Sequence, residues 1–342
     1  MQRLFARYAA VLLAAPLVLL AVQSAPQSIS AAGKASSAAT VAAARANFIK
    51  DMSSHATALG GGAWTSPGAE HAAAKTAANG TVSEFPSYNW SGYADSESGT
   101  KTVSNVSGSW ILPAVTCPTA PYQNSDAFLA NWVGVDGFAD QTVEQLGTGA
   151  QCYEGVTYYY VWYEMYPAGT VEEGTTACIN DNVNCPEPGD LISASVSVTP
   201  GASGSNNYAL KLTDRTRPWE SFSTSASCAT ATCVDSSGEW VIERPAFELP
   251  FGAQILPLAA YGRTYFTSGS IVSGGKSTNI QGFKDGPVYD MPMMDDSTSY
   301  YLDCVDQPSK PGSLLSLTDA SACPTATPTP SGGFETSWDA GF

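Results

Sequence analysis

The stretch LISASVSVTP, Leu191 to Pro200, places Ile192, Ala194, Val196 and Val198 at every second position, with serines between them. Side chains alternate between the two faces of a strand, so this pattern predicts a strand with one buried face. Similar runs recur between clusters of Gly, Pro, Asn, Asp and Ser, at 101–113, 128–137, 158–167, 208–213, 239–245, 262–272 and 313–318. No long stretch keeps a helical apolar period. Closely spaced strands with few helices predict an antiparallel sandwich or barrel.

The two ends of the chain differ in composition from its middle. Residues 1–32 carry Arg3 and Arg7, then an apolar run and small residues, which is the order of a secretory signal peptide. Residues 33–84 lack a strand pattern and are interpreted either as a propeptide that docks on an acidic domain and leaves it at low pH, or as a disordered leader. Residues 85–323 are expected to form one β domain, and the Pro/Thr/Ser/Gly-rich residues 324–342 a flexible tail. We therefore expect a secreted, extracellular protein.

The charge balance excludes several classes of partner. From residue 85 onward the chain has nine Lys and Arg against 28 Asp and Glu, a formal charge of 9 − 28 = −19. Such a field disfavours nucleic acid and anionic membrane surfaces as partners. Crowded carboxylates also repel one another, so their folded-state pKa values rise and stability increases as the pH falls. The composition suits an acidic medium, although an acidic surface that only keeps a secreted protein soluble fits it equally well. Nothing in the sequence argues for an obligate oligomer, so we expect a monomer.

All eight cysteines lie after residue 84, in a chain expected to meet an oxidising compartment. Disulfides are therefore expected. Two close pairs, Cys178 with Cys185 and Cys228 with Cys233, would each close a short loop. The pairing of Cys117, Cys152, Cys304 and Cys323 stays open, because spacing does not decide it. No C-x-x-C or Cys/His spacing is present, so the cysteines do not indicate a metal site.

The catalytic groups available to the domain are limited. No histidine occurs after His71, which removes Ser-His and Cys-His pairs, a histidine base and histidine metal ligands once residues 1–84 are cleaved. A G-x-S-x-G elbow, a P-loop and a dinucleotide G-x-G-x-x-G are also missing. Carboxylates, amides and aromatic side chains remain.

Three stretches interrupt apolar strand patterns with polar groups. In DQTVEQLGTG (140–149), Gln145 shares a face with Val143 and Gly147, and Glu144 takes the other face. In YYYVWYEMYP (158–167), Glu164 shares a face with Trp162. If such faces converge, they form an aromatic-walled cleft that holds an amide and several acids.

The third stretch is SGEWVIERP (237–245), in which Glu239 and Glu243 share a face by strand parity. Two strand steps separate them, roughly 13 Å along the strand, so we do not expect one carboxyl pair. Glu239 is assigned a supporting or surface role. Glu144 is expected to be structural or solvent-exposed.

Four motifs in order, NWVGVDG, VEQLGTG, YVWYEMYP and EWVIE, resemble the eqolisin family of glutamic peptidases, and YNWSGYAD and LPLAAYGRTYF extend the resemblance to about residues 88–271. The family implies a two-sheet antiparallel β-sandwich of jelly-roll, concanavalin-like type. It further implies an acid-active, pepstatin-insensitive endopeptidase that is secreted as a precursor and cleaves protein or peptide substrates without metal or cofactor.

The resemblance assigns roles by motif. Gln145 and Glu243 become the catalytic dyad, and the substrate-binding positions become Trp132, Asp136, Trp162 and Glu164. Two departures affect the expected subsites: Tyr160 stands where fungal members typically have Asp, and Arg244 and Pro245 follow the catalytic Glu in place of Asp-Phe.

Two readings from other classes stay open. A jelly-roll glycoside hydrolase would use two carboxylates, such as Glu164 and Glu243, with tryptophans stacked on sugar rings. A lectin-like binding module would keep the aromatic cleft and need no general base.

Overall fold

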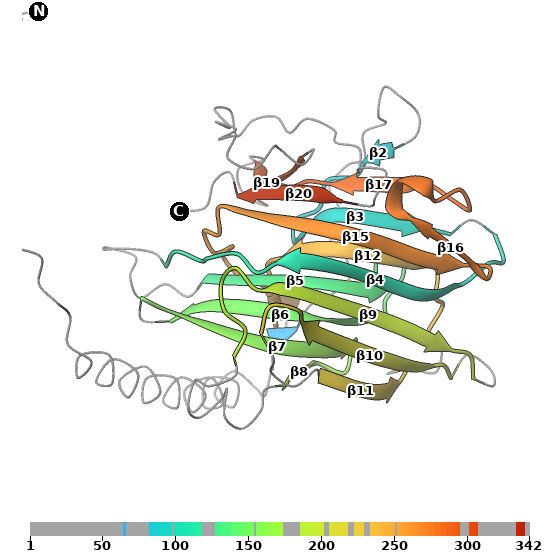
Figure 1. Ribbon diagram of the computed structural model, residues 1–342, viewed down its shortest axis with the longest axis horizontal. Coiled ribbons are helices and arrows are strands. Elements are labelled where there is room, and N and C mark those ends of the chain that lie inside the picture. Colours follow the sequence, from blue (N-terminus) through green and yellow to red (C-terminus); the bar gives the residue numbers. More distant parts are fainter. Residues whose placement is uncertain are drawn as a thin grey trace, which may run out of the picture.

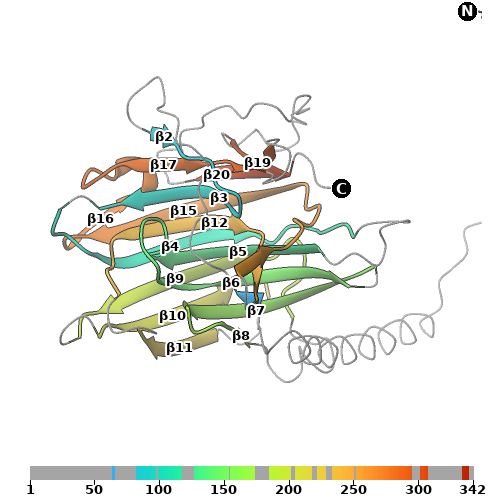
Figure 2. The same ribbon diagram turned by 180° about the vertical axis from the view of Figure 1, so that it is seen from behind.

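The computed structural model describes residues 64–65, 82–97, 99–117, 127–153, 155–173, 185–201, 205–217, 222–228, 233–249, 252–294, 301–306 and 333–338. Seen from opposite sides, these strands form two stacked sheets (Figure 1, Figure 2). The predicted two-sheet sandwich is confirmed. The expected signal peptide, most of the leader, Cys178, Cys323 and the run at 313–318 lie outside the described residues.

The eight-stranded sheet carries the predicted site. Its order is β2 (Val82–Glu84), β17 (Val288–Met291), β3 (Trp90–Ser96), β12 (Ser237–Glu243), β5 (Ala127–Val135), β6 (Val143–Tyr153), β7 (Val156–Tyr166) and β8 (Thr170–Glu173). All its pairings are antiparallel except that of β2 with β17.

The second sheet has nine strands. Its order is β11 (Phe222–Ser227), β10 (Asn207–Asp214), β9 (Leu191–Thr199), β4 (Val103–Ile111), β15 (Arg263–Ser273), β20 (Phe334–Trp338), β19 (Tyr301–Asp306) and β18 (Met293–Met294), with β16 (Lys276–Asn279) paired to β15. A 3₁₀ turn, η2 (Ile280–Gly282), follows β16. A small third sheet joins β1 (Trp64–Thr65), β13 (Ala246–Leu249) and β14 (Gly252–Ile255).

The main core lies between the two large sheets. Ile192 and Val196 of β9 meet Val133 and Trp240 of the opposite sheet in one buried cluster. The alternating burial of β9 reproduces the pattern of its sequence. A second cluster, which contains Trp132, lies on the other face of the eight-stranded sheet. That sheet is therefore apolar on both faces, which explains why every residue of β12 is buried.

Part of the predicted flexible tail is a strand, which corrects the sequence prediction. β20 pairs with β15 and β19 inside the nine-stranded sheet. Phe334 is 1% exposed, and its ring stacks on that of Phe266 at 4.7 Å and meets that of Tyr93 at 4.9 Å. The Pro/Thr tract dominated the composition of residues 324–342. The alternation in FETSW is short beside that tract, but it supplies an aromatic side chain to the core.

Two disulfides are placed in the described chain. Cys117 bonds Cys152, which decides the pairing that the sequence left open, and Cys228 bonds Cys233 as predicted. Cys185 is also disulfide-bonded, and its predicted partner lies outside the described residues. Within those residues no helix has the length and apolar character to cross a membrane.

Candidate active site

Strand register brings most of the predicted site onto one face of the eight-stranded sheet. Directly paired residues of neighbouring antiparallel strands lie on the same face. β12, β5, β6 and β7 lie side by side (Figure 2), and their pairings form three parallel rows across the sheet. The rows are Glu239–Gly134–Gln145–Glu164, Val241–Trp132–Gly147–Trp162 and Glu243–Ala130–Gly149–Tyr160. Five of the six predicted site residues thus share the face of the second apolar cluster.

Gln145 is positioned by its neighbour on β7. Its Nε2 donates a hydrogen bond to Oε2 of Glu164 at 3.3 Å, and both side chains are buried. Because Glu164 is directly opposite Gln145 in the register, the bond runs straight across the strand pair. The contact orients the amide through one of its two N–H donors.

Glu243 is held by Trp132. The indole Nε1 donates to Oε2 of Glu243 at 2.8 Å, inside the buried face. Trp90, which pairs with Glu243 on β3, packs edge-on against Trp132 with the ring centroids 4.8 Å apart. A hydrogen bond from an N–H group favours the ionised form of a carboxyl, so this contact suits a carboxylate base.

Gln145 and Glu243 come from strands that β5 separates in the sheet. By register they are two strands and two rows apart, about 10 Å across the sheet and about 13 Å along it. Trp132 bridges this gap. A Cβ at Gly134 would lie 2.8 Å from Cζ3 of Trp132 and 3.2 Å from Cβ of Gln145, so the indole covers Gly134 and reaches the row of Gln145. The site is therefore centred on one indole, with Glu243 at its nitrogen and Gln145 beside its far edge.

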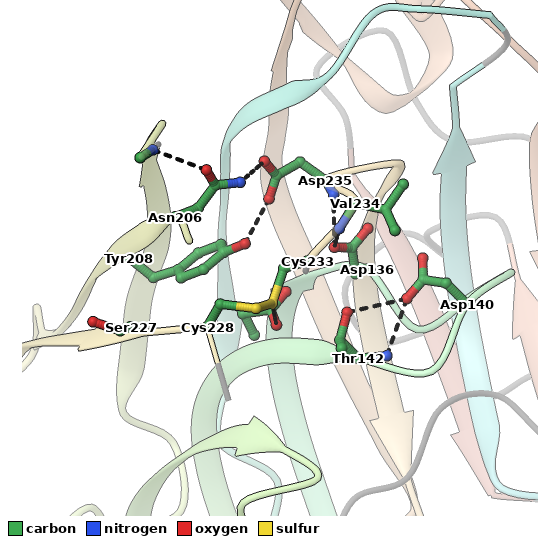
Figure 3. The surroundings of a disulfide bond; sticks show 12 residues. Asp136, Asp140, Thr142, Asn206, Tyr208, Ser227, Cys228, Cys233, Val234 and Asp235 are labelled. Carbon is green, nitrogen blue, oxygen red and sulfur yellow. Dashed lines mark hydrogen bonds between the residues drawn. A yellow bond between two sulfur atoms is a disulfide. The ribbon is translucent and has the colours of Figure 1, made fainter. Parts of the chain in front are cut away.

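Asp136 does not belong to the three rows and binds backbone groups of another segment. It has φ 69° at the end of β5, and its carboxylate accepts bonds from the backbone N–H groups of Val234, Asp235 and Ser236 at 2.5–3.0 Å. Figure 3 shows it beneath this segment. Because the segment leads directly into β12, Asp136 positions the strand that carries Glu243.

A cluster of acids surrounds this anchor beside the Cys228–Cys233 disulfide (Figure 3). Asp235 accepts bonds from Nδ2 of Asn206 and the hydroxyl of Tyr208. Oε1 of Glu144 lies 2.9 Å from Sγ of Cys233. A disulfide sulfur has no proton to donate, so this is a close contact between the carboxyl and the disulfide and not a hydrogen bond from sulfur.

Burial and mutual repulsion raise the pKa values of Glu144 and Asp136. Burial, then the charges of Asp136, Asp235 and Asp140, raises the pKa of Glu144 to about 10. Burial and Asp140 raise the pKa of Asp136 to about 8, against the backbone bonds that lower it. Glu144 faces away from Gln145, as expected from parity, but it is buried and not exposed.

The described residues with metal-like spacing are Glu144, Cys228 and Cys233. Both sulfurs belong to the disulfide and cannot act as thiolate ligands in this state. The arrangement does not fit a metal site.

The sequence did not indicate the positions of two residues of this face, Trp90 and Glu239. Trp90 belongs to the quoted YNWSGYAD motif, yet its contact with Trp132 depends on the pairing of distant strands. Glu239 is not at the surface: it is 0% exposed and lies in the row of Gln145. Strand parity indicated its face, but parity does not show what covers that face.

Arg244, one departure from the family pattern, also has a structural role. It is buried, and it donates from Nε to the carbonyl of Tyr88 at 2.6 Å and from Nη2 to that of Met294 at 3.2 Å. These bonds fix the end of β12 next to Glu243.

A family comparison now adds to this geometry. The profile described as the Peptidase A4 family matches residues 88–304, a range that contains every row of the site. The chain belongs to the peptidase A4 family. The eqolisin resemblance is thereby confirmed, and the protein is a peptidase with protein substrates.

Solved structures give weaker similarities to this A4 peptidase. The aspergilloglutamic peptidase from Aspergillus niger is 20% identical with a TM-score of 0.41, over 62% of this chain and 99% of that one. The alginate lyase from Klebsiella pneumoniae is 10% identical with a TM-score of 0.23, over 45% and 54%. No curated protein matches. Because both TM-scores are low, the family assignment rests on the profile match.

Proposed function

We propose that this A4 peptidase is a secreted endopeptidase that works in acid, with Glu243 as general base and Gln145 as oxyanion donor. The observation that carries the proposal is the Trp132 indole, which holds the Glu243 carboxylate at its nitrogen and reaches the row of Gln145. A substrate peptide lying over this indole has a base on one side and an amide donor on the other.

The side chains suffice for peptide hydrolysis. Glu243 takes a proton from water as the water oxygen attacks the scissile carbonyl, and it can return that proton to the leaving amine. General acid–base catalysis of this kind contributes roughly 10²–10⁴ in rate. Gln145 donates an N–H to the developing oxyanion, and a lost donor of this kind costs about 2.7–4 kcal/mol. An amide does not titrate, so this donor works throughout the acid range.

The four remaining residues have supporting roles in the proposal. Glu164 orients the amide of Gln145, and Trp132 orients Glu243. Trp162 pairs across Gly147 with Trp132 and provides an apolar wall for substrate side chains. Asp136 acts indirectly by fixing the entry to β12.

Acid proteolysis tests the function. The purified protein should degrade a denatured protein substrate in acid, and pepstatin should not inhibit it, as the eqolisin resemblance implies. Release of sugar from a polysaccharide without proteolysis would favour the glycosidase reading with Glu164 and Glu243. Binding without any hydrolysis would favour the lectin-like module.

Substitutions test the dyad. Glu243→Gln should lower kcat by at least about 10², because a neutral amide cannot take the water proton. Gln145→Ala should lower it by about 10²–10³. A folded Glu243→Gln protein that cleaves at the wild-type rate would refute the assignment, whereas full activity of Gln145→Ala would remove only the oxyanion role.

Secretion as a zymogen is part of the proposal. It is supported by one contact of the leader: Trp64–Thr65 pairs antiparallel with Phe247 and Ala246 of β13, a strand that begins three residues after Glu243. The leader strand thus pairs with the strand that follows β12 in the chain. Amino-terminal sequencing of the secreted protein should find a start after residue 65; a start before about Gly60 would contradict a cleaved propeptide.

A further inference from the structure

A hollow of about 290 Å³ lies on the outer face of the nine-stranded sheet, away from the candidate active site. The strands β10, β9, β4 and β15 are neighbours in that sheet (Figure 1), and each contributes to the lining. Their inward side chains belong to the main core, so the residues between them point outward. The lining consists of six hydroxyl side chains, two cations and the small residues Gly108 and Ala194.

The surroundings of this hollow differ from the rest of a strongly acidic chain. The chain has 31 Asp and Glu against 15 Lys and Arg. The adjoining strands β11, β10, β9, β4 and β15 together contain one acid, Asp214. It is buried, and its carboxylate accepts bonds from the backbone N–H groups of Thr216 and Arg217. The charges that line the hollow are therefore those of its two cations, Lys211 and Arg215.

Both cations are available to a ligand. Lys211 and Arg215 are exposed, and neither forms an ion pair with a residue that the structure describes. Lys101 and Arg217, by contrast, each bind a carboxylate at the surface. An anion that enters the hollow thus does not have to displace a carboxylate of the described chain.

Strand register places hydroxyl groups beside Lys211. It pairs with Ser195, which pairs with Ser107, so the three side chains form one row on the outer face. None of these three side chains has a hydrogen-bond partner within the described part of the chain. In the next row the hydroxyls of Ser193 and Ser109 bond each other at 2.8 Å. The first row thus offers an ammonium group and two hydroxyl donors to a single ligand.

These groups indicate the class of ligand. Ammonium, guanidinium and hydroxyl groups all donate hydrogen bonds, and a tetrahedral oxyanion accepts several of them at once. Bonds between a charged donor and an anionic oxygen are the stronger kind. The described lining has no aromatic ring on which a sugar could stack, and it has no carboxylate to bind a hard cation.

We propose that this hollow binds a sulfate or phosphate group, either as the free ion or as an ester on a larger molecule. Lys211 and Arg215 supply the charge, and Ser107 and Ser195 supply hydroxyl donors. The inference goes beyond the proposed peptidase function, because the hollow and the candidate active site lie on different sheets. Anion binding is measured without turnover, so the failure of one proposal is distinguishable from that of the other.

Titrations with inorganic sulfate and inorganic phosphate test the site. At constant ionic strength, set with chloride, backbone amide NMR shifts report both the affinity and the position of binding. Saturable shifts should appear at Ser107, Ser195 and Lys211. Lys211→Gln and Arg215→Gln should each weaken binding by about tenfold, and Ser195→Ala by roughly two- to tenfold. Surface substitutions of this kind rarely disturb folding, and thermal unfolding checks this for each variant.

Lys276→Gln is the matched control. Lys276 is an exposed cation on β16 of the same sheet, but it does not line the hollow. Its replacement should leave the affinity for either anion unchanged. Equal weakening in Lys276→Gln and Lys211→Gln would show that only the overall charge matters, and it would overturn the proposal. Shifts that do not saturate, or that are confined to residues outside the hollow, would also overturn it.

Dextran sulfate and neutral dextran distinguish the two sources of the anion. If the ligand is an ester on a larger molecule, dextran sulfate should bind more tightly per sulfate group than inorganic sulfate. Equal affinity per sulfate group would assign the hollow to the free ion. In both cases Lys211→Gln should weaken the binding. Neutral dextran that binds as tightly as dextran sulfate would refute an anion site.

Discussion

At the scale of single residues, the site depends on the absence of a side chain at Gly134. The indole of Trp132 covers this glycine, and its edge comes within 2.8 Å of the position that a Cβ would take. A side chain there would push the ring away from Glu243 or toward Gln145. The glycine is thus required by close approach of a ring, and not by its backbone conformation.

Gly134→Ala should therefore lower both activity and stability. Overpacking of a buried site costs about 1–3 kcal/mol, and displacement of the indole weakens the bond that orients Glu243. Thermal unfolding and kcat/KM for an acid substrate measure the two effects. Trp132→Phe provides the reference, because phenylalanine lacks the second ring. In that background the penalty of Gly134→Ala should shrink, and additive penalties would show that the ring is not the obstacle.

Sequence parity predicted which acids share a face but not their protonation or their cover. Alternation along a strand is local, so parity gave the face of each acid and amide within its own strand, and the strand register brings the faces of Gln145, Glu164 and Glu243 together. Glu239, expected in a supporting or surface role, is fully buried, and strand parity shows the face of a side chain but not what covers that face. Likewise, the bond from Trp132 to Glu243 joins residues 111 positions apart, a separation that no local pattern encodes.

At the scale of elements, the strands with long alternating runs were predictable and the short ones were not. β9 and β10 alternate over their full length, and the structure buries the apolar set of each. β20 has five residues after a Pro/Thr tract, and its place depends on β15 and β19. The edge that it fills exists only once the other strands have folded.

Phe334→Ala should reveal β20 as part of the fold. Loss of a buried phenylalanine costs about 3–5 kcal/mol, so the melting temperature should fall clearly. Val171→Ala on β8 is the control: Val171 is 40% exposed, and its replacement should change stability by no more than about 0.5 kcal/mol. If the Phe334→Ala protein is as stable as the Val171→Ala protein, residues 334–338 do not contribute to the stability of the fold.

At the scale of the whole molecule, the net charge of −16 is unevenly distributed. The described cations include Lys101, which pairs with Asp285, and Arg217, which pairs with Glu187 and Asp190 at the surface. The acids beside the Cys228–Cys233 disulfide have no such partners among the ion pairs of the described chain. Asp136 holds the segment that enters β12, so the protonation of this cluster connects global stability to the strand that carries Glu243.

The stability of the protein should therefore decrease as the pH rises. Burial raises the folded-state pKa of Asp136 to about 8 and of Glu144 to about 10, above the unfolded values near 4. Between the unfolded and the folded pKa values, the folded state binds more protons than the unfolded state. The stabilisation that these two acids contribute is therefore complete below about pH 4 and is lost as the pH rises through their folded pKa values. Denaturant unfolding across pH 3–8 should show a falling free energy.

Two variants distinguish this cause from general surface repulsion. Glu144→Gln removes one buried proton site, so its unfolding free energy should fall less steeply with pH and exceed that of the wild type near neutrality. Asp285→Asn should have the opposite pH dependence. Lys101 lowers the pKa of this exposed acid, so the stability that Asp285 contributes is present above its unfolded pKa and absent in strong acid. If both variants parallel the wild type at every pH, the buried cluster does not set the pH dependence, and the entry to β12 is not its acid-dependent element.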